Sequence, residues 1–370
     1  MMATPLISRA LLDPRSVLEL SLRQWDLLVR QGRRANLLAR LARVLENAGL
    51  LPLIPDAPRL HLRSAVMMNE QQINLTRWEL ECIQQALHKL EVPVVLLKGA
   101  AYLAAKLPVA LGRSFSDVDI LVPKQQIGSV ESQLMIHGWV GTHHDPYDQK
   151  YYRQWMHEIP PLSHSRRNTT IDVHHSILPE TARIKVRAEL LFDRIVPVPG
   201  LDGLFVLHPI DMVLHSATHL FHEGEFDNGL RDLFDLDGLF RHFGDTPDFW
   251  ETLVSRALEV GVERPLFYAI RYTTRFFGTP VPLSIVNQSQ CAKPSFLVLK
   301  TMDFCYARAL RPDHDSCALA ASALGRFALF LRSHWIRMPF HLLVSHLTRK
   351  ALKRQKRPEP VPFVAKDGQG

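Results

Sequence analysis

The stretch that decides the fold reads Gly112-Arg113-Ser114-Phe115-Ser116-Asp117-Val118-Asp119-Ile120-Leu121-Val122. In a β-strand successive side chains point to opposite faces, so Asp117 and Asp119 share one face while apolar residues occupy the other. The apolar face anchors the strand in a core, and the two carboxylates converge on the opposite side. We therefore predict a strand over residues 117–122 that presents paired carboxylates.

Two carboxylates this close repel each other unless a cation lies between them. A site made only of oxygen ligands suits Mg²⁺ or Mn²⁺. The alternative is that Asp117 and Asp119 are solvated residues at a strand edge, paired with Arg113. Their alternation with apolar residues at the start of a core strand favours metal binding.

A third carboxylate lies in Thr169-Thr170-Ile171-Asp172-Val173-His174-His175. The same alternation places Asp172 and His174 on one face of a strand, from which Asp172 can join the first pair across the sheet. Taken alone, Asp172 would more often be a strand-end residue or a helix cap than a ligand. Its pairing with the earlier motif favours a functional role.

The surrounding pattern predicts an α/β core. Strands are expected at residues 94–97, 117–122, 139–140 and 171–177, and helices at 100–107 and 124–137. The polar passage before residue 171 is expected to include a hairpin. Helical periodicity dominates residues 17–50, continues to about residue 90, and returns beyond residue 209.

This pattern divides the chain into four expected parts. Residues 1–91 form an N-terminal helical region and residues 92–207 the α/β core. Residues 208–352 form a C-terminal helical domain, and residues 353–370 a basic, disordered tail.

The ordered motifs resemble the nucleotidyltransferase superfamily that includes polymerase β and, within it, the uncharacterised bacterial nucleotidyltransferase group. The resemblance covers roughly residues 92–240, and an ordered set of motifs is more specific than a lone Asp-x-Asp. The matching motifs are Leu97-Lys98-Gly99, Arg113, Asp117-Val118-Asp119-Ile120-Leu121-Val122 and Ile171-Asp172-Val173-His174.

The resemblance implies an α+β fold with a polymerase β-type core, a small mixed sheet with helices flanked by helical regions. It implies that Asp117 and Asp119 hold two Mg²⁺ (or Mn²⁺) ions on a nucleoside triphosphate such as ATP. Asp172 would complete the metal site beside the acceptor and accept its proton. A nucleoside monophosphate would pass to a hydroxyl of a small molecule, sugar, protein or RNA, with pyrophosphate leaving. The expected nucleotide-binding residues are Lys98, Gly99, Arg113, Ser114 and Ser116.

One residue departs from the superfamily pattern. The usual Gly-Ser at the phosphate turn is Gly99-Ala100 here, so the hydroxyl expected to touch the phosphates is missing. Ser114, Ser116, Lys98 or Arg113 can take its place. The departure leaves open a second hypothesis, a non-catalytic nucleotide-binding or membrane-associated scaffold protein.

Histidines support a third hypothesis, a metal-dependent hydrolase. His215 and His219 are four residues apart on one helical face, a spacing that can bind metal. The alternative is that they pack beside the active-site cleft as polar, partly buried groups. The absence of an HExxH motif or a cysteine pair favours that alternative. Asp235 follows them in a Leu-Arg-x-x-x-Asp stretch that the resembled group shares, with no assigned role.

The charge distribution and the cysteine content indicate where in the cell the protein is expected. The formal charge of +7 is concentrated near the C-terminus, so residues 327–357 can contact an anionic membrane, the alternative being a docked terminal helix with a solvated basic tail. The apolar run at residues 317–331 is too short to span a bilayer and is expected to form a buried helix. Four dispersed cysteines and no leader pattern predict a cytoplasmic protein, which the basic C-terminal segment can bring to a membrane surface as a peripheral protein.

Overall fold

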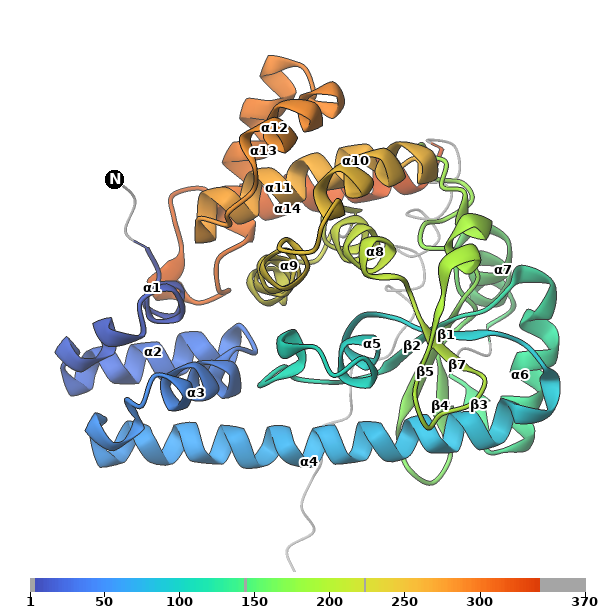
Figure 1. Cartoon of the computed structure of the whole chain (residues 1–370), viewed down its shortest axis with the longest axis horizontal. Helices are drawn as coiled ribbons and strands as arrows, with labels where there is room; N and C mark the ends of the chain where they lie inside the picture. The colour runs from blue at the N-terminus through green and yellow to red at the C-terminus, as the bar shows by residue number, and fades with distance from the viewer. Residues whose placement is uncertain (1–3, 143–144, 223, 340–370) are drawn as a thin grey trace, which may run out of the picture.

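The computed structural model describes residues 4–142, 145–222 and 224–339, and Figure 1 shows their arrangement. A twisted sheet lies at one side, N-terminal helices lie at the other, and the long helix α4 (Asp56–Leu87) runs beneath both. The C-terminal helices pack above the centre of the molecule in this view.

The sheet has seven strands in the order β3-β4-β5-β2-β1-β7-β6. Its centre is parallel where β2 pairs with β5 and where β1 pairs with β7, but antiparallel between β1 and β2. The sheet is therefore mixed. The strands are β1 (Val94–Leu96), β2 (Val118–Leu121), β3 (Trp139–Gly141), β4 (Leu162–His164), β5 (Thr170–His174), β6 (Val196–Pro197) and β7 (Leu204–Val206).

The predicted α+β fold is confirmed. The expected strands are present, and β4 and β5 form the expected hairpin in the polar passage. The pattern did not reveal β6 or β7, because strands of two and three residues are too short to show alternation. Helices α5 (Lys98–Ala104), α6 (Ile127–Ile136) and α7 (Pro146–Trp155) complete the core.

The N-terminal helices are α1 (Leu6–Leu12), α2 (Leu22–Arg34) and α3 (Leu38–Asn47). Helix α4 has 32 residues, about 48 Å at 1.5 Å per residue, and so reaches from these helices to the sheet. Near its far end Glu79 is buried and accepts hydrogen bonds from Trp139 Nε1, Arg167 Nε and Thr169 Oγ1. The charged side chain ties α4 to the β3–β4–β5 edge of the sheet.

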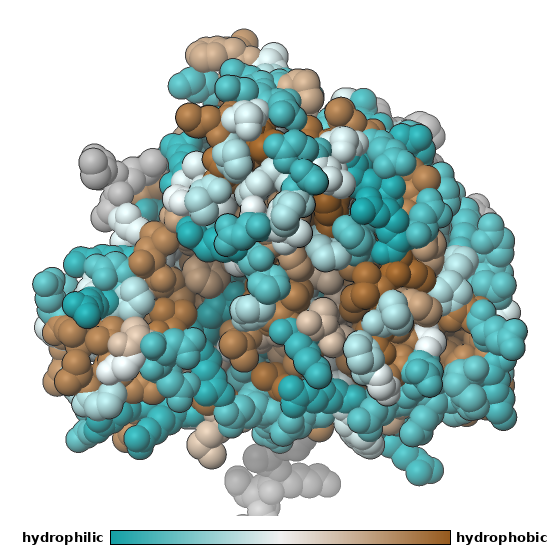
Figure 2. Space-filling view, in the orientation of Figure 1, coloured by the Kyte–Doolittle hydropathy of each residue, from teal (hydrophilic) through white to brown (hydrophobic). Residues whose placement is uncertain are grey.

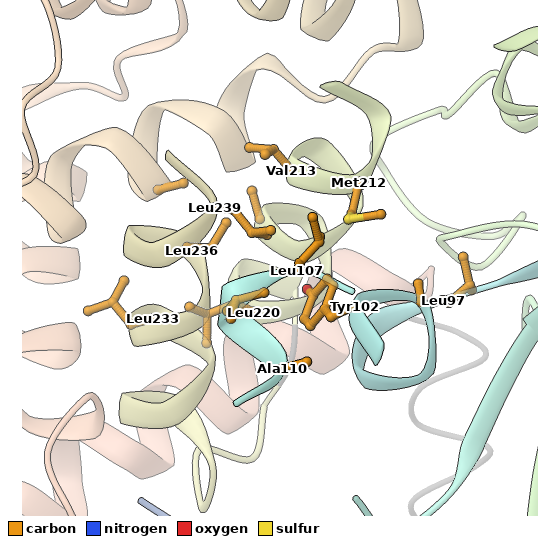
Figure 3. Packing of buried hydrophobic residues seen from close by; sticks show 14 of the residues in the cluster. Leu97, Tyr102, Leu107, Ala110, Met212, Val213, Leu220, Leu233, Leu236 and Leu239 are labelled. Carbon is orange, nitrogen blue, oxygen red and sulfur yellow. The ribbon is translucent and has the colours of Figure 1, made fainter. Parts of the chain in front are cut away.

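The C-terminal helices are α8 (Pro209–His222), α9 (Gly229–Phe243), α10 (Phe249–Val260), α11 (Glu263–Phe277), α12 (Leu283–Gln288), α13 (Phe296–Ala309) and α14 (Ser322–Arg337). Helices α8 and α9 share a buried apolar layer with α5, in which Tyr102 lies near Leu107 and Leu220 (Figure 3). Tyr102 Oη also lies 2.6 Å from Ser216 Oγ of α8. This layer fixes α8 and α9 over the start of α5.

The expectation of a buried helix at residues 317–331 is wrong. Helix α14 buries only Gly325, Leu329 and Ser333, while its larger apolar side chains remain exposed. The reason is close packing on α13, where a Cβ at Gly325 would lie 3.1 Å from Arg308 Cδ. None of the described helices is both long enough and apolar enough to cross a membrane.

Exposed apolar side chains also occur elsewhere. Figure 2 shows hydrophobic patches among hydrophilic residues on one face, including the region where α2 and α3 lie in Figure 1. Leu22 of α2, Leu53 and Leu60 of α4 are each about two-thirds exposed. The expected basic tail at residues 353–370, and the part of residues 327–357 beyond residue 339, lie outside the described residues.

Candidate active site

The first part of the site is the turn where β1 ends and α5 begins. Lys98 has a φ of 47°, a left-handed backbone conformation that is uncommon outside glycine. The next residue is glycine, and a Cβ there would lie 2.2 Å from Nη1 of Arg113, so a larger residue would have to displace this side chain. The turn therefore brings the backbone of Gly99 directly against the Arg113 guanidinium.

Asp119 lies on β2 facing this turn, and its side chain is almost fully buried. Its Oδ1 accepts hydrogen bonds from Lys98 Nζ at 2.8 Å and from His174 Nε2 at 3.0 Å. Burial alone would raise the pKa of Asp119, but Lys98 and His174 outweigh burial and hold this pKa well below its usual range. Asp119 is therefore ionised at neutral pH.

Asp172 lies opposite Asp119 on the neighbouring parallel strand β5, in direct register with it. Its Oδ1 is buried and has no hydrogen-bond partner among the described residues. Burial, followed by the charges of Asp119 and Glu158, raises the pKa of Asp172 to about 7. A cation bound here would supply the missing partner and relieve the repulsion, so the pair fits a divalent metal.

Asp117 lies just before β2 and is exposed to solvent. Its Oδ1 accepts a hydrogen bond from Ser116 Oγ at 2.8 Å. Among the described residues, the three aspartates do not form a group whose oxygens all lie within 4.8 Å of one another. The structure thus places Asp119 and Asp172 in register, and side chains must move before all three aspartates can share one ion.

A cavity of about 260 Å³ opens between the Lys98 turn, the start of β2 and the α8–α9 connection. Five carboxylates and three cationic side chains line it, so a polyanionic ligand cannot be neutralised by the protein alone and needs cations with it. The carboxylates belong to Asp117, Asp119, Glu225, Asp227 and Asp232, and the cations to Lys98, Arg113 and Arg231. Asp172 is not among the residues that line this cavity.

Arg113 is buried, and a carboxylate of the protein itself balances its charge. Its Nε donates to Asp235 Oδ2 at 2.7 Å, and Arg40 Nη1 lies 2.8 Å from Asp235 Oδ1. Burial would lower the pKa of Arg113, but Asp235 and then Asp232 raise it above its usual value. Asn69 Nδ2 of α4 also donates to the Arg113 carbonyl at 2.6 Å. These contacts join α3, α4 and α9 at the residue that precedes the Asp-x-Asp strand.

The other predicted nucleotide-binding residues separate into two groups. Lys98, Gly99 and Ser116 line the cavity together with Arg113. Ser114 instead lines a different cavity beside α2, α3 and α4. Ala100 lies in the buried apolar core and does not line the 260 Å³ cavity, so Ser116 is the hydroxyl that the structure places there.

The histidines of α8 lie beside the site. His215 is buried, and burial followed by the charge of Lys98 lowers its pKa to about 3. His219 lines the cavity. Among the described residues, the group of side chains spaced for metal binding contains neither of them.

A second cavity, of about 720 Å³, lies away from these residues. It opens at the start of β1 and β7 beside the end of α4, whereas the Lys98 turn lies at the opposite end of β1. Its lining includes Glu91 and Asp202 but none of the motif residues. The smaller cavity is the candidate active site.

The sequence analysis missed two residues of this neighbourhood, His157 and Glu158, and one ion pair, that of Asp235 with Arg113. Glu158 lies 3.3 Å from His174 Nδ1 through its Oε2. The shared Leu-Arg-x-x-x-Asp stretch was a usable signal for Asp235. No spacing in the sequence linked His157 or Glu158 to β5, because Glu158 lies 16 positions before His174 along the chain.

A family model described as "Uncharacterised nucleotidyltransferase" matches residues 21–278, which is more than half of the chain. No curated protein and no solved structure matches the chain. The matched range runs beyond the motifs on both sides, from α2 through α11, and so includes Arg40, Asn69 and Asp235, which hold Arg113. The matched range also contains Asp119 of β2, Asp172 of β5 and the turn at Lys98 and Gly99. The chain belongs to the uncharacterised nucleotidyltransferase family.

Proposed function

We propose that the protein transfers a nucleoside monophosphate from a nucleoside triphosphate to a hydroxyl group of an acceptor. The acceptor oxygen forms a bond to the α-phosphorus, the bond from that phosphorus to the β-phosphate oxygen breaks, and pyrophosphate leaves. The observation that carries the proposal is the register pair of Asp119 and Asp172, in which a buried Asp172 oxygen has no partner among the described residues.

Asp117, Asp119 and Asp172 are the residues that would hold Mg²⁺ or Mn²⁺. When bound, these ions neutralise charge on the phosphates and orient them for in-line displacement. Asp172 is the carboxylate that we place beside the acceptor, and we assign it the proton of the acceptor hydroxyl. Lys98 and Ser116 are the cavity residues assigned to the triphosphate.

Lys98 connects binding to the metal site. In the described state its Nζ neutralises Asp119. Divalent ions at Asp119 would replace this charge, and we assign Lys98 Nζ to a phosphate oxygen in that state. Arg113, in contrast, is held by Asp235, so we assign it the positioning of Gly99 and of the strand that follows.

The test uses each of the four nucleoside triphosphates, labelled at the α-phosphate, with Mg²⁺ and a cell extract. Mass spectrometry then identifies what gains a nucleotide. Labelling should be lost in Asp117→Asn and Asp119→Asn, and kept in Asp193→Asn, a matched change at an exposed aspartate outside the cavity. Undiminished labelling in both cavity variants would overturn the proposal.

Ala100 motivates the alternative that the protein binds a nucleotide without transferring it. The same experiment separates transfer from binding alone. The alternative predicts that labelled triphosphate binds in the presence of Mg²⁺ and that this binding is lost in Asp119→Asn. It also predicts that none of the four nucleoside triphosphates yields a labelled product.

A second candidate function is peripheral contact with an anionic membrane. On α14, Leu324, Phe327, Leu331 and Trp335 recur at helical spacing and are 46–61% exposed. Basic residues Arg326 and Arg332 lie on the same helix, a combination typical of interfacial helices. Flotation with vesicles containing phosphatidylglycerol should be lost in the double variant Phe327→Ser, Leu331→Ser. It should persist in Leu60→Ser, an exposed leucine of α4; absence of flotation by the unaltered chain removes this candidate.

A further inference from the structure

A second group of metal-type ligands lies beside the aspartates. Among the described residues, His157, Glu158 and His174 each offer one ligand atom, and these atoms all lie within 4.8 Å of one another. Two imidazoles and one carboxylate form a different donor set from the oxygen-only set of Asp117, Asp119 and Asp172. Such mixed sets suit borderline ions such as Zn²⁺, Fe²⁺ and Co²⁺.

The backbone holds these ligands in place. Glu158 pairs with His174 in an antiparallel bridge, and Ile159 N donates to the Val173 carbonyl at 3.0 Å. His175 N donates to the His157 carbonyl at 2.8 Å. The segment after α7 is therefore attached to the end of β5 on both sides of Glu158. Ligands carried on paired backbone keep their geometry without the ion, which lowers the cost of binding it.

The distances fit a small ion. Two ligands of a tetrahedral zinc with bonds of about 2.1 Å lie roughly 3.4 Å apart. His174 Nδ1 and Glu158 Oε2 are 3.3 Å apart. The His157 ring lies against the His174 ring with centroids 5.2 Å apart. The ligand atom of His157 lies within 4.8 Å of those of both other residues.

The orientation of His174 is fixed by a carboxylate behind it. Its Nε2 lies 3.0 Å from Asp119 Oδ1, so Nδ1 is the nitrogen presented to Glu158. A carboxylate that holds one nitrogen of a histidine while the other binds a metal is the usual arrangement around protein-bound zinc.

A metal-free explanation accounts for part of this geometry. A protonated His174 could bridge Asp119 and Glu158 as an ion pair on each side. That reading leaves His157 unexplained, because His157 Nδ1 is buried without a hydrogen-bond partner among the described residues. Buried polar atoms of this kind call for a missing ligand or water.

We infer that His157, Glu158 and His174 bind one divalent transition-metal ion of the Zn²⁺ class, with the remaining coordination positions open to water. The site is separate from the Mg²⁺ site of the proposed function and touches it through the His174–Asp119 contact. The inference does not depend on nucleotidyl transfer, since it concerns an ion that binds without nucleotide.

The experiment is a Co²⁺ titration of the whole, chelator-treated protein without nucleotide, followed by the visible absorption of the bound cobalt. We expect one equivalent to bind, with displacement by Zn²⁺ but not by Mg²⁺. His157→Gln and Glu158→Gln should each weaken binding by about tenfold or more, the scale at which even supporting residues of metal sites act. His242→Gln, at an exposed histidine of α9, should bind as the unaltered protein does.

A variant that gains a spectral band tests the site even if other variants lose binding because they fold poorly. In His157→Cys the bound Co²⁺ should acquire the intense near-ultraviolet band of a thiolate ligand. Asp117→Asn should lose nucleotidyl transfer but keep the cobalt spectrum, so failure of one proposal is distinguishable from failure of the other. The inference is overturned if no cobalt band forms, if the band survives unchanged in both His157→Gln and Glu158→Gln, or if it is lost in Asp117→Asn while those two variants keep it.

Discussion

Two carboxylates near the Lys98 turn, those of Asp172 and Asp235, have opposite surroundings. Asp235 lies between the guanidinium groups of Arg113 and Arg40, which neutralise it. Asp172 faces the carboxylates of Asp119 and Glu158 and has a buried oxygen with no partner among the described residues. The comparison teaches that a buried carboxylate balanced by the protein's own cations stabilises the fold, whereas one placed beside other carboxylates is available to an added cation.

The largest expected effect comes from breaking the balanced group. Asp235→Ala leaves two buried guanidinium groups without their counter-charge and should lower the free energy of unfolding by about 3–5 kcal/mol. Urea unfolding measures the change. The control, Asp26→Ala, removes an exposed i,i+4 pair with Arg30 and should cost less than about 1 kcal/mol. Equal losses in the two variants would show that Asp235 does not hold the site together.

The reverse outcome, a loss of activity without a loss of stability, is expected for Asp172, which lies beside other carboxylates. Asp172→Asn should reduce nucleotidyl transfer by about a hundredfold or more, which corresponds to about 2.7 kcal/mol in the barrier. Its free energy of unfolding should stay the same or rise, because the change removes repulsion with Asp119 and Glu158. Rates and urea unfolding on the same preparation test both halves. A large loss of stability would contradict the comparison.

Gly99 lies against the Arg113 guanidinium of the balanced group. Gly99→Ala places a Cβ 2.2 Å from Arg113 Nη1 and must displace that guanidinium from Asp235. We expect a loss of about 1–3 kcal/mol, the usual cost of overpacking. Gly128→Ala is the matched control, because nothing lies within 4 Å of a Cβ there and α6 should gain slightly. Thermal unfolding of the two variants should therefore shift in opposite directions.

His222 is a buried basic side chain, and it extends the comparison beyond the two carboxylates. Neither of its ring nitrogens has a hydrogen-bond partner among the described residues, and burial, with Arg332 and Arg337, lowers its pKa to about 3. Below pH 6.5 the unfolded chain takes up a proton that folded His222 does not, so stability falls as the pH falls. His222→Phe should flatten that dependence by about 1.4 kcal/mol per pH unit between pH 6.5 and pH 3. Urea unfolding at several pH values would show an unchanged slope if His222 were not responsible.

Much of the fold and part of the site could be predicted from local patterns. Alternation in residues 117–122 and 171–177 predicted β2 and β5 and the faces of Asp119 and Asp172, because a strand has a fixed period of two. Alternation could not show that Ser114, before β2 begins, lines a different cavity from Ser116. Nor could hydropathy show that α14 exposes its large apolar side chains, because the packing of Gly325 on α13 decides which face is buried.

The sequence by itself determined that carboxylates alternate with anchoring apolar residues, and that a glycine follows Lys98 where a strand ends. Those properties depend on backbone periodicity and on residue size, which are local. Only the tertiary structure decided that Asp235 neutralises Arg113 from 122 residues away and that Glu158 and His157 lie beside His174. Charge balance depends on distances between elements, and these exist only once the helices have packed on the sheet.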